Sequence, residues 1–84
     1  MTVKQVRYSP SADALYVRLA DGEHGWTEDL GDLRHVDYGK DGEVLGVEFL
    51  NPRASGVDLT DVPHAGEIGA ELEKLGFRVT QPAT

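Results

Sequence analysis

The stretch Asp13-Ala14-Leu15-Tyr16-Val17-Arg18-Leu19 decides the fold of this chain. From Leu15 onward every second residue is a large apolar one, which is the period of a β-strand that buries one face. The residues just before it, Ser9-Pro10-Ser11, favour a turn. Residues 3–8 lead into that turn as a further short strand. The opening third of the chain therefore predicts a pair of antiparallel strands.

A hairpin is predicted around Asp41-Gly42, a dipeptide typical of a two-residue turn with positive φ. With these two residues at the tip, the apolar and polar side chains of the two strands separate onto opposite faces. A slip of one residue would mix the faces, so the separation supports this register. The predicted pairs are Val36 with Val47, Tyr38 with Leu45 and Arg34 with Phe49 on the apolar face, and His35 with Glu48 and Asp37 with Gly46 on the polar face.

The rest of the chain predicts a weaker strand, a helix and a short final strand. Residues 25–30 form the weaker strand, with Trp26 and Glu28 on one side. A C-terminal helix is predicted over residues 60–76, because apolar residues recur there at spacings of three and four. Thr60 or Asp61 is its expected N-cap and Gly76 its left-handed C-cap. Residues 77–80 predict the final strand, and we expect residues 81–84 to fray.

We therefore expect one α+β domain over residues 1–84. An antiparallel β-meander of four to five strands occupies residues 3–50, and one C-terminal α-helix packs on one of its faces. A chain of 84 residues without cysteine buries a modest core and has no disulfide to support it. We expect a homodimer through a sheet edge or face. The predicted core consists of Val6, Tyr8, Leu15, Val17, Leu19, Val36, Tyr38, Leu45, Val47, Phe49, Ile68, Leu72 and Leu75.

The charge balance restricts the partners of this chain. Its 15 acidic and 8 basic residues give a net charge of -7. Proteins that bind nucleic acid rely on basic residues to neutralise phosphates, so direct nucleic-acid binding is not expected. An acidic surface instead steers a protein toward basic partners, and it also keeps a protein soluble. No run approaches the roughly 18 apolar residues that span a bilayer, so we expect a cytoplasmic protein with no membrane partner.

The segment from Tyr8 to Leu50 resembles a family of small, uncharacterised prokaryotic proteins catalogued as a domain of unknown function. The resemblance rests on Asp13-Ala14-Leu15-Tyr16-Val17, on Val36-Asp37-Tyr38 with Asp41-Gly42, and on Gly46-Val47-Glu48-Phe49-Leu50. Because that family has no settled activity, the resemblance implies no catalytic residues for this chain. It suggests a likeness to the antitoxin halves of two-gene toxin systems.

The polar face of the predicted sheet is the place to look for chemistry. His35, Asp37 and Glu48 are the catalytic candidates, because a histidine between carboxylates can act as a general acid or base or bind a divalent cation. The ordinary interpretation is a solvated face on which His35 and Glu48 form a cross-strand pair contributing about 0.2–1 kcal/mol. We favour this ordinary interpretation, and we expect no cofactor and no metal site.

A partner-binding surface is the leading functional hypothesis. The chain is interpreted as a non-enzymatic protein-interaction module, in one form an antitoxin-like partner of a basic protein such as a ribonuclease toxin. Alternative hypotheses are a small metal-dependent or acid-base enzyme on the polar sheet face, and a small-ligand-binding domain near Tyr16 and Trp26. A solvated helix face also explains the helix acids. The candidate partner-binding residues are Asp61, Glu67, Glu71, Glu73, Tyr16 and Arg18.

Overall fold

Five antiparallel strands form the main sheet of the computed structural model, which describes residues 3–80. The strands are β1 (Gln5–Ser9), β2 (Ala14–Arg18), β3 (His24–Asp29), β4 (Arg34–Gly39) and β5 (Val44–Leu50). The α+β class with an antiparallel sheet and a C-terminal helix is confirmed. Residues 81–84, for which fraying is predicted, lie outside the described residues.

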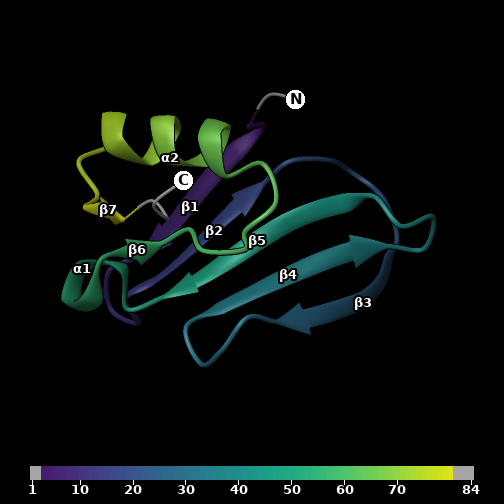
Figure 1. Cartoon of the computed structure of the whole chain (residues 1–84), viewed down its shortest axis with the longest axis horizontal. Helices are drawn as coiled ribbons and strands as arrows, with labels where there is room; N and C mark the ends of the chain where they lie inside the picture. The colour runs from purple at the N-terminus through teal and green to yellow at the C-terminus, as the bar shows by residue number, and fades with distance from the viewer. Residues whose placement is uncertain (1–2, 81–84) are drawn as a thin grey trace.

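The strand order is β1-β2-β5-β4-β3, which departs from a simple meander at one point. β2 pairs with β5 instead of β3, so the connection after β2 crosses the ends of β5 and β4 before β3 begins (Figure 1). The Leu45 carbonyl holds this crossing, because it accepts hydrogen bonds from the N–H groups of Leu19 at 2.8 Å and Ala20 at 3.2 Å. β3 thereby becomes an outer strand of the sheet.

The β4-β5 hairpin keeps four of its five predicted pairs. The exception is Tyr38, which lies opposite Val44, because the register shifts between Asp37 and Tyr38. The Gly42 N–H donates to the Gly39 carbonyl, and Gly42 itself has φ +89°. This is a three-residue loop closed by a glycine bulge instead of the predicted two-residue turn. The added loop residue is compensated farther along β5, where the pairing returns to the predicted register.

The C-terminal part contains two helices and a small parallel sheet. α1 is Pro52–Ser55, β6 is Val57–Asp58, α2 is Ala65–Lys74 and β7 is Val79–Thr80, and β6 pairs with β7. α2 begins later than predicted, since His64 is its N-cap and neither Thr60 nor Asp61 caps it. His64 and Asp61 both have positive φ, so the chain cannot be helical through them. Gly76, with φ +87°, adopts the predicted left-handed conformation after α2.

Asp13, in the turn between β1 and β2, holds α1 in place. Its carboxylate accepts hydrogen bonds from the N–H groups of Arg53 and Ala54, both at 3.2 Å, and from the Tyr8 hydroxyl at 2.9 Å. The pKa of Asp13 lies below its ordinary value: desolvation raises it, but these hydrogen bonds lower it more. Asp13 therefore supplies, from 40 residues away, the N-terminal cap that Asn51 does not provide.

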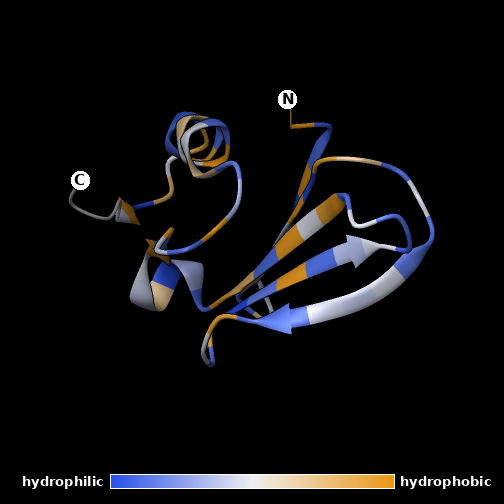
Figure 2. Cartoon of the chain, turned by 45° about the vertical axis from the view of Figure 1, so that its right-hand side comes forward, coloured by the Kyte–Doolittle hydropathy of each residue, from blue (hydrophilic) through white to orange (hydrophobic). Residues whose placement is uncertain are grey.

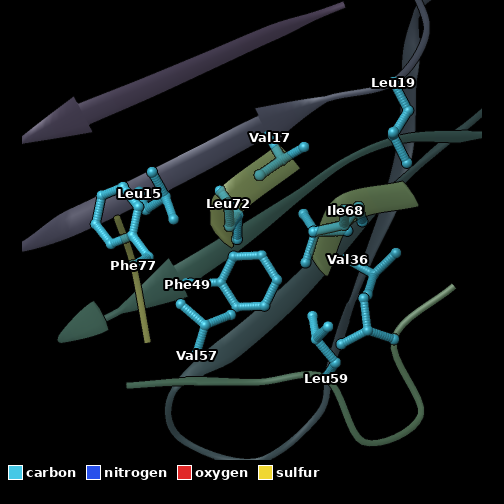
Figure 3. Close-up of a cluster of buried hydrophobic side chains, with 12 residues drawn as sticks. Leu15, Val17, Leu19, Val36, Phe49, Val57, Leu59, Ile68, Leu72 and Phe77 are labelled. Carbon is cyan, nitrogen blue, oxygen red and sulfur yellow. The ribbon is translucent and has the colours of Figure 1, made fainter. Parts of the chain in front are cut away.

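The core lies between α2 and the β1-β2-β5 side of the sheet. Figure 3 shows Ile68 and Leu72 of α2 beside Phe49 of β5, with Val57 and Leu59 on the other side of its ring. Three residues of the predicted core are only partly buried: Val6, Tyr8 and Tyr38. The prediction that Leu75 belongs to the core is wrong, because its side chain is 49% exposed. Among residues 3–80, four buried residues of the hydrophobic core cluster were not predicted: Val57, Leu59, Val62 and Phe77.

The covering elements leave one side of the sheet bare. α2, β6 and β7 gather over the β1-β2-β5 side in both views, away from β3 (Figures 1 and 2). All six residues of β3 are exposed. Figure 2 colours this strand blue to white, since it has no strongly hydrophobic residue. Within residues 3–80, no helix has the length and apolar character needed to cross a membrane.

Candidate functional site

The catalytic candidates lie together on the sheet face opposite α2. Tyr16, Glu48 and His35 form one row across β2, β5 and β4. Arg18, Gly46 and Asp37 form the next row. Side chains of β-strands alternate between faces, so these residues point away from the buried Leu15 and Val17. We call this surface the polar face.

Tyr16 and Asp37 are joined across β5 because Gly46 has no side chain. The Tyr16 hydroxyl donates to Asp37 Oδ2 at 3.0 Å. A Cβ atom on Gly46 would lie 2.3 Å from the Tyr16 Oη atom, so any larger residue would displace the phenol. Burial and the hydrogen bond to the Asp37 carboxylate raise the pKa of Tyr16 to about 12. The phenol is therefore a hydrogen-bond donor and stays protonated at neutral pH.

The second oxygen of Asp37 binds residues of β3. The Thr27 hydroxyl donates to Asp37 Oδ1 at 2.7 Å, and His24 Nε2 lies 2.8 Å from the same hydroxyl oxygen. Since the Thr27 hydrogen is donated to Asp37, the His24 Nε2 atom donates to Thr27. Tyr16, Asp37, Thr27 and His24 thus form one hydrogen-bonded row that ties β2, β4 and β3 together.

His35 is held by an aspartate of β3, although Glu48 is its cross-strand neighbour. His35 Nδ1 lies 2.6 Å from Asp29 Oδ1. Within the described chain, no group of three or more histidine, aspartate or glutamate side chains is arranged to hold a metal ion. The candidate residues His35, Asp37 and Glu48 share a face, but the first two are each bound to residues of the sheet itself.

The predicted partner-binding residues fall on two opposite surfaces. Glu67, Glu71 and Glu73 belong to α2, whereas Tyr16 and Arg18 lie on the polar face. Two of the helix acids have close nitrogen-bearing neighbours: Glu71 lies 3.8 Å from the Lys74 ammonium and Glu67 lies 3.9 Å from the His64 imidazole. Asp61, exposed in the loop before α2, has φ +62°. One partner patch therefore cannot include the helix acids together with Tyr16 and Arg18.

β3 and its flanking loops form a third surface, which the sequence analysis did not single out. Residues 19–33 contain five acidic residues and neither lysine nor arginine, and this is the signal that could have identified it. The acids are Asp21, Glu23, Glu28, Asp29 and Asp32. We call residues 19–33 the acidic segment.

Three of these acids, Glu28, Asp29 and Asp32, have no ion pair with a lysine or an arginine among residues 3–80. Asp29 instead pairs with the His35 imidazole, whose Nδ1 lies 2.6 Å from Asp29 Oδ1. Asp21 and Glu23, by contrast, form ion pairs with basic side chains. The acids of this segment without a lysine or arginine partner therefore lie in β3 and in the loop that follows it.

Trp26 lies at the centre of this surface and on the same side of the sheet as the core. It is 49% exposed, and its ring stacks on Tyr38 with the centroids 5.2 Å apart. Tyr16 projects from the other side of the sheet. A small ligand lying on one face cannot contact both Tyr16 and Trp26, so the two residues do not form a shared binding site as the ligand hypothesis required.

Comparison with known proteins identifies a family without assigning an activity. No curated protein and no solved structure matches this chain. Residues 5–52 match the family described as "Protein of unknown function (DUF2283)". The match covers β1 to β5, which is the whole five-stranded sheet, and ends at Pro52, the first residue of α1. Since it spans more than half of the sequence, the chain belongs to the DUF2283 family of proteins of unknown function.

Proposed function

We propose that this chain is a non-enzymatic protein-interaction module that binds a basic partner protein through the acidic segment. The observation that carries the proposal is β3, which is exposed over all six residues and has an aromatic ring beside Glu28 and Asp29, neither of which has a lysine or arginine partner among residues 3–80. An exposed aromatic side chain within a charged rim is typical of residues that anchor protein interfaces.

The electrostatics favour β3 over α2 as the binding surface. On α2, Lys74 offsets part of the acidic charge by lying beside Glu71. On β3, Glu28 accepts a hydrogen bond from the Tyr38 hydroxyl and Asp29 lies beside the His35 imidazole, and among residues 3–80 neither acid has a lysine or arginine partner. A basic partner gains more from reaching carboxylates that the protein has not already neutralised, because it replaces solvent and not an existing ion pair.

The polar face supports binding less well than β3 does. Asp37 already accepts hydrogen bonds from Tyr16 and Thr27, and His35 is bound to Asp29. These contacts stabilise the pairing of β2, β4 and β3. We therefore assign them to the fold and do not develop the acid-base or metal-dependent hypothesis further.

The test compares two matched double variants as baits in a lysate of the native host. Glu28→Gln/Asp29→Asn removes two charges from β3, and Glu71→Gln/Glu73→Gln removes two from α2. We expect the unmodified chain to retain a basic protein at low salt and to release it at high salt, because exposed charges are screened. The β3 variant should lose this protein and the α2 variant should keep it. Capture of no basic protein by any bait would contradict the proposal.

Self-association and location are separate predictions. The expected homodimer is measured by sedimentation equilibrium at micromolar concentration, and a monomer there would contradict it. Two β3 strands would place two acidic segments side by side, so we expect a dimer to use another surface. We also retain the prediction of a cytoplasmic location, which fractionation of host cells would check.

A further inference from the structure

The outer edge of β3 carries free peptide groups. The Leu30 N–H donates to the Arg34 carbonyl at 2.9 Å, so the peptide groups of Leu30 face β4. Hydrogen-bonding direction alternates along an antiparallel strand, and the pairing of residues 26–29 with β4 is regular. Thr27 and Asp29 therefore direct their N–H and C=O groups away from β4. Among residues 3–80, no strand lies on that side.

β3 has only part of the protection that such an edge usually carries. Proteins block outer strands with charged side chains, lysine above all, and with proline, bulges or a covering element, because a free edge pairs readily with another strand. The charges of β3, Glu28 and Asp29, are acidic, so they repel a copy of the same strand and not a basic one. β3 has neither lysine nor proline, and its bulge lies at the beginning, between His24 and Trp26. The other outer strand, β1, has Lys4 before it, Arg7 within it and Pro10 after it. Of the two outer strands of the main sheet, β3 is the one that combines an open edge with an exposed aromatic ring.

The charge of the acidic segment selects the occupant. A second copy pairing β3 with β3 would bring the two acidic segments together, and like charges across strands are destabilising. A second copy pairing β1 with β3 would match charges, but such a head-to-tail contact leaves an edge free at each end and extends into a filament. An extended basic segment of a different protein would pair with the acidic side chains and with the free peptide groups of β3. It would cause neither repulsion between like charges nor growth of a filament.

We propose that an extended, arginine- or lysine-rich segment of another protein adds to β3 as a further strand of the sheet; this inference rests on the proposed function. Its peptide groups pair with those of Thr27 and Asp29. Its side chains alternate between the sheet faces. On one face a basic side chain meets Glu28 and the Trp26 ring, where a cation also interacts with the aromatic face. On the other face it meets Asp29.

The first experiment separates backbone pairing from charge. The probe is a capped peptide of about eight residues in which arginine and valine alternate, a length that covers a strand like β3. Its matched control has the same sequence with alternate peptide nitrogens methylated along one edge, so that the charge stays and the strand donors are lost. Binding to the full chain is measured through the fluorescence of the sole tryptophan. We expect methylation to weaken binding on the order of tenfold or more, because several hydrogen bonds are lost.

The second experiment places the contact on β3. Thr27→Pro removes an outward N–H, whereas Thr27→Ala removes the same hydroxyl and keeps that N–H. We expect the proline variant to bind the peptide on the order of tenfold more weakly than the alanine variant, because the lost N–H would pair with the peptide. Circular dichroism checks that both variants fold, and the methylated peptide gives an answer even if the proline variant does not.

The outcomes distinguish this inference from the proposed function. Equal binding of both peptides, lost in Glu28→Gln/Asp29→Asn, would overturn strand addition while leaving a basic-partner module. Loss of binding in Glu71→Gln/Glu73→Gln instead would place the partner on α2 and overturn the β3 site. Binding of neither peptide would overturn both proposals. Filaments of the chain that dissociate when the peptide is added would show that β1 of a second copy pairs with β3. That result would overturn the proposal that the partner is a different protein.

Discussion

Gly46 is the residue over which the Tyr16 ring lies, and a methyl group there would meet two obstacles. Its Cβ would lie 2.3 Å from the Tyr16 hydroxyl oxygen and 2.7 Å from the Val17 carbonyl oxygen. We predict that Gly46→Ala lowers the free energy of unfolding by about 1–3 kcal/mol, as overpacking typically does. Urea denaturation followed by circular dichroism measures the change.

The matched test of this steric argument is Gly46→Ala in a Tyr16→Ala background. In that background Gly46→Ala should lower the free energy of unfolding by less, because the phenol is absent and only the Val17 carbonyl oxygen remains in the way. Strictly additive effects of the two substitutions would show that Tyr16 is not what makes glycine necessary at position 46.

Tyr16 also makes stability depend on pH at the alkaline end. Its pKa is raised from 10.0 to about 12, so the folded protein holds this proton more tightly than the unfolded chain does. The stabilisation is therefore complete below pH 10 and is lost as the pH rises through 12. Because the phenol is partly exposed, we expect a loss of only about 1 kcal/mol.

The measurement of this pH effect is a comparison of unfolding midpoints for the unmodified chain and Tyr16→Phe at neutral and alkaline pH. The difference in unfolding midpoint between the two proteins should become smaller at alkaline pH. The pKa values of Tyr8 and Tyr38 are also raised by burial, but both residues are present in both proteins, so they do not affect the comparison. A gap that stays constant with pH would contradict the role assigned to the Tyr16 hydroxyl.

At the scale of elements, α2 is attached to the sheet by a narrow set of apolar residues. Leu72 is completely buried, whereas Leu75 is 49% exposed. We predict that Leu72→Ala costs about 2–5 kcal/mol of unfolding free energy, the usual range for a buried leucine. Leu75→Ala should change it by less than about 1 kcal/mol. Chemical denaturation of both variants checks the pair, and similar costs would mean that α2 docks through a different face.

Gly66 offers a change in the opposite direction. It lies in the first turn of α2, and a Cβ atom there would meet nothing within 4 Å. Gly66→Ala should therefore stabilise the protein by about 0.5–1 kcal/mol, because alanine loses less backbone entropy in a helix. Thermal unfolding measures it. A lower melting temperature would show that this turn of α2 is not helical in solution.

The sheet was predictable from sequence because its signals are local. The alternation from Leu15 to Leu19 and the separated faces around Val36 and Val47 fix the strands and most of their register. The shift at Tyr38 was not predictable from Asp41-Gly42 alone, because that dipeptide also suits a three-residue loop in which Gly42 forms a bulge.

Helix boundaries and the remaining core depend on less local effects. The apolar spacing that includes Ile68 and Leu72 continues to Leu75, but the helix ends there, and Phe77 becomes buried after the chain reverses at Gly76. Val57, Leu59 and Val62 are buried in a segment without a regular period. Their burial follows from where the sheet and α2 meet, and no local pattern indicates it.

The candidate surfaces were predictable only in part for the same reason. Tyr16 and Asp37 are 21 residues apart, and their contact depends on two strand registers and on the absence of a side chain at Gly46. The bonds from Asp37 to Thr27 and from His35 to Asp29 depend on the position of β3. The register of β3 follows from the three-residue loop between Leu30 and Arg34, in which Gly31 has φ +88°.

Over the whole molecule, the two outer strands differ in charge. Lys4 and Arg7 lie at the β1 edge, and the acidic segment surrounds the β3 edge. A charge distribution of this kind produces a negative potential around β3 that steers cations toward it and weakens as salt is added. Trp26 is positioned to report this potential, because it is exposed, is the sole tryptophan of the chain and lies within the acidic segment.

We predict that caesium ions quench Trp26 relatively more effectively than iodide ions do, with free tryptophan as the reference. At low ionic strength each ion should differ from its reference by about two- to threefold, caesium upward and iodide downward, because a local potential of one thermal-energy unit changes ion concentrations by such factors. Added salt should reduce the difference between caesium and iodide quenching, and the double variant Glu28→Gln/Asp29→Asn should reduce it as well. Glu71→Gln/Glu73→Gln removes the same charge from α2 and should have a smaller effect. Equal effects of the two variants would mean that Trp26 senses only the net charge of the molecule, and the local attraction for a basic strand at β3 would then lack its electrostatic basis.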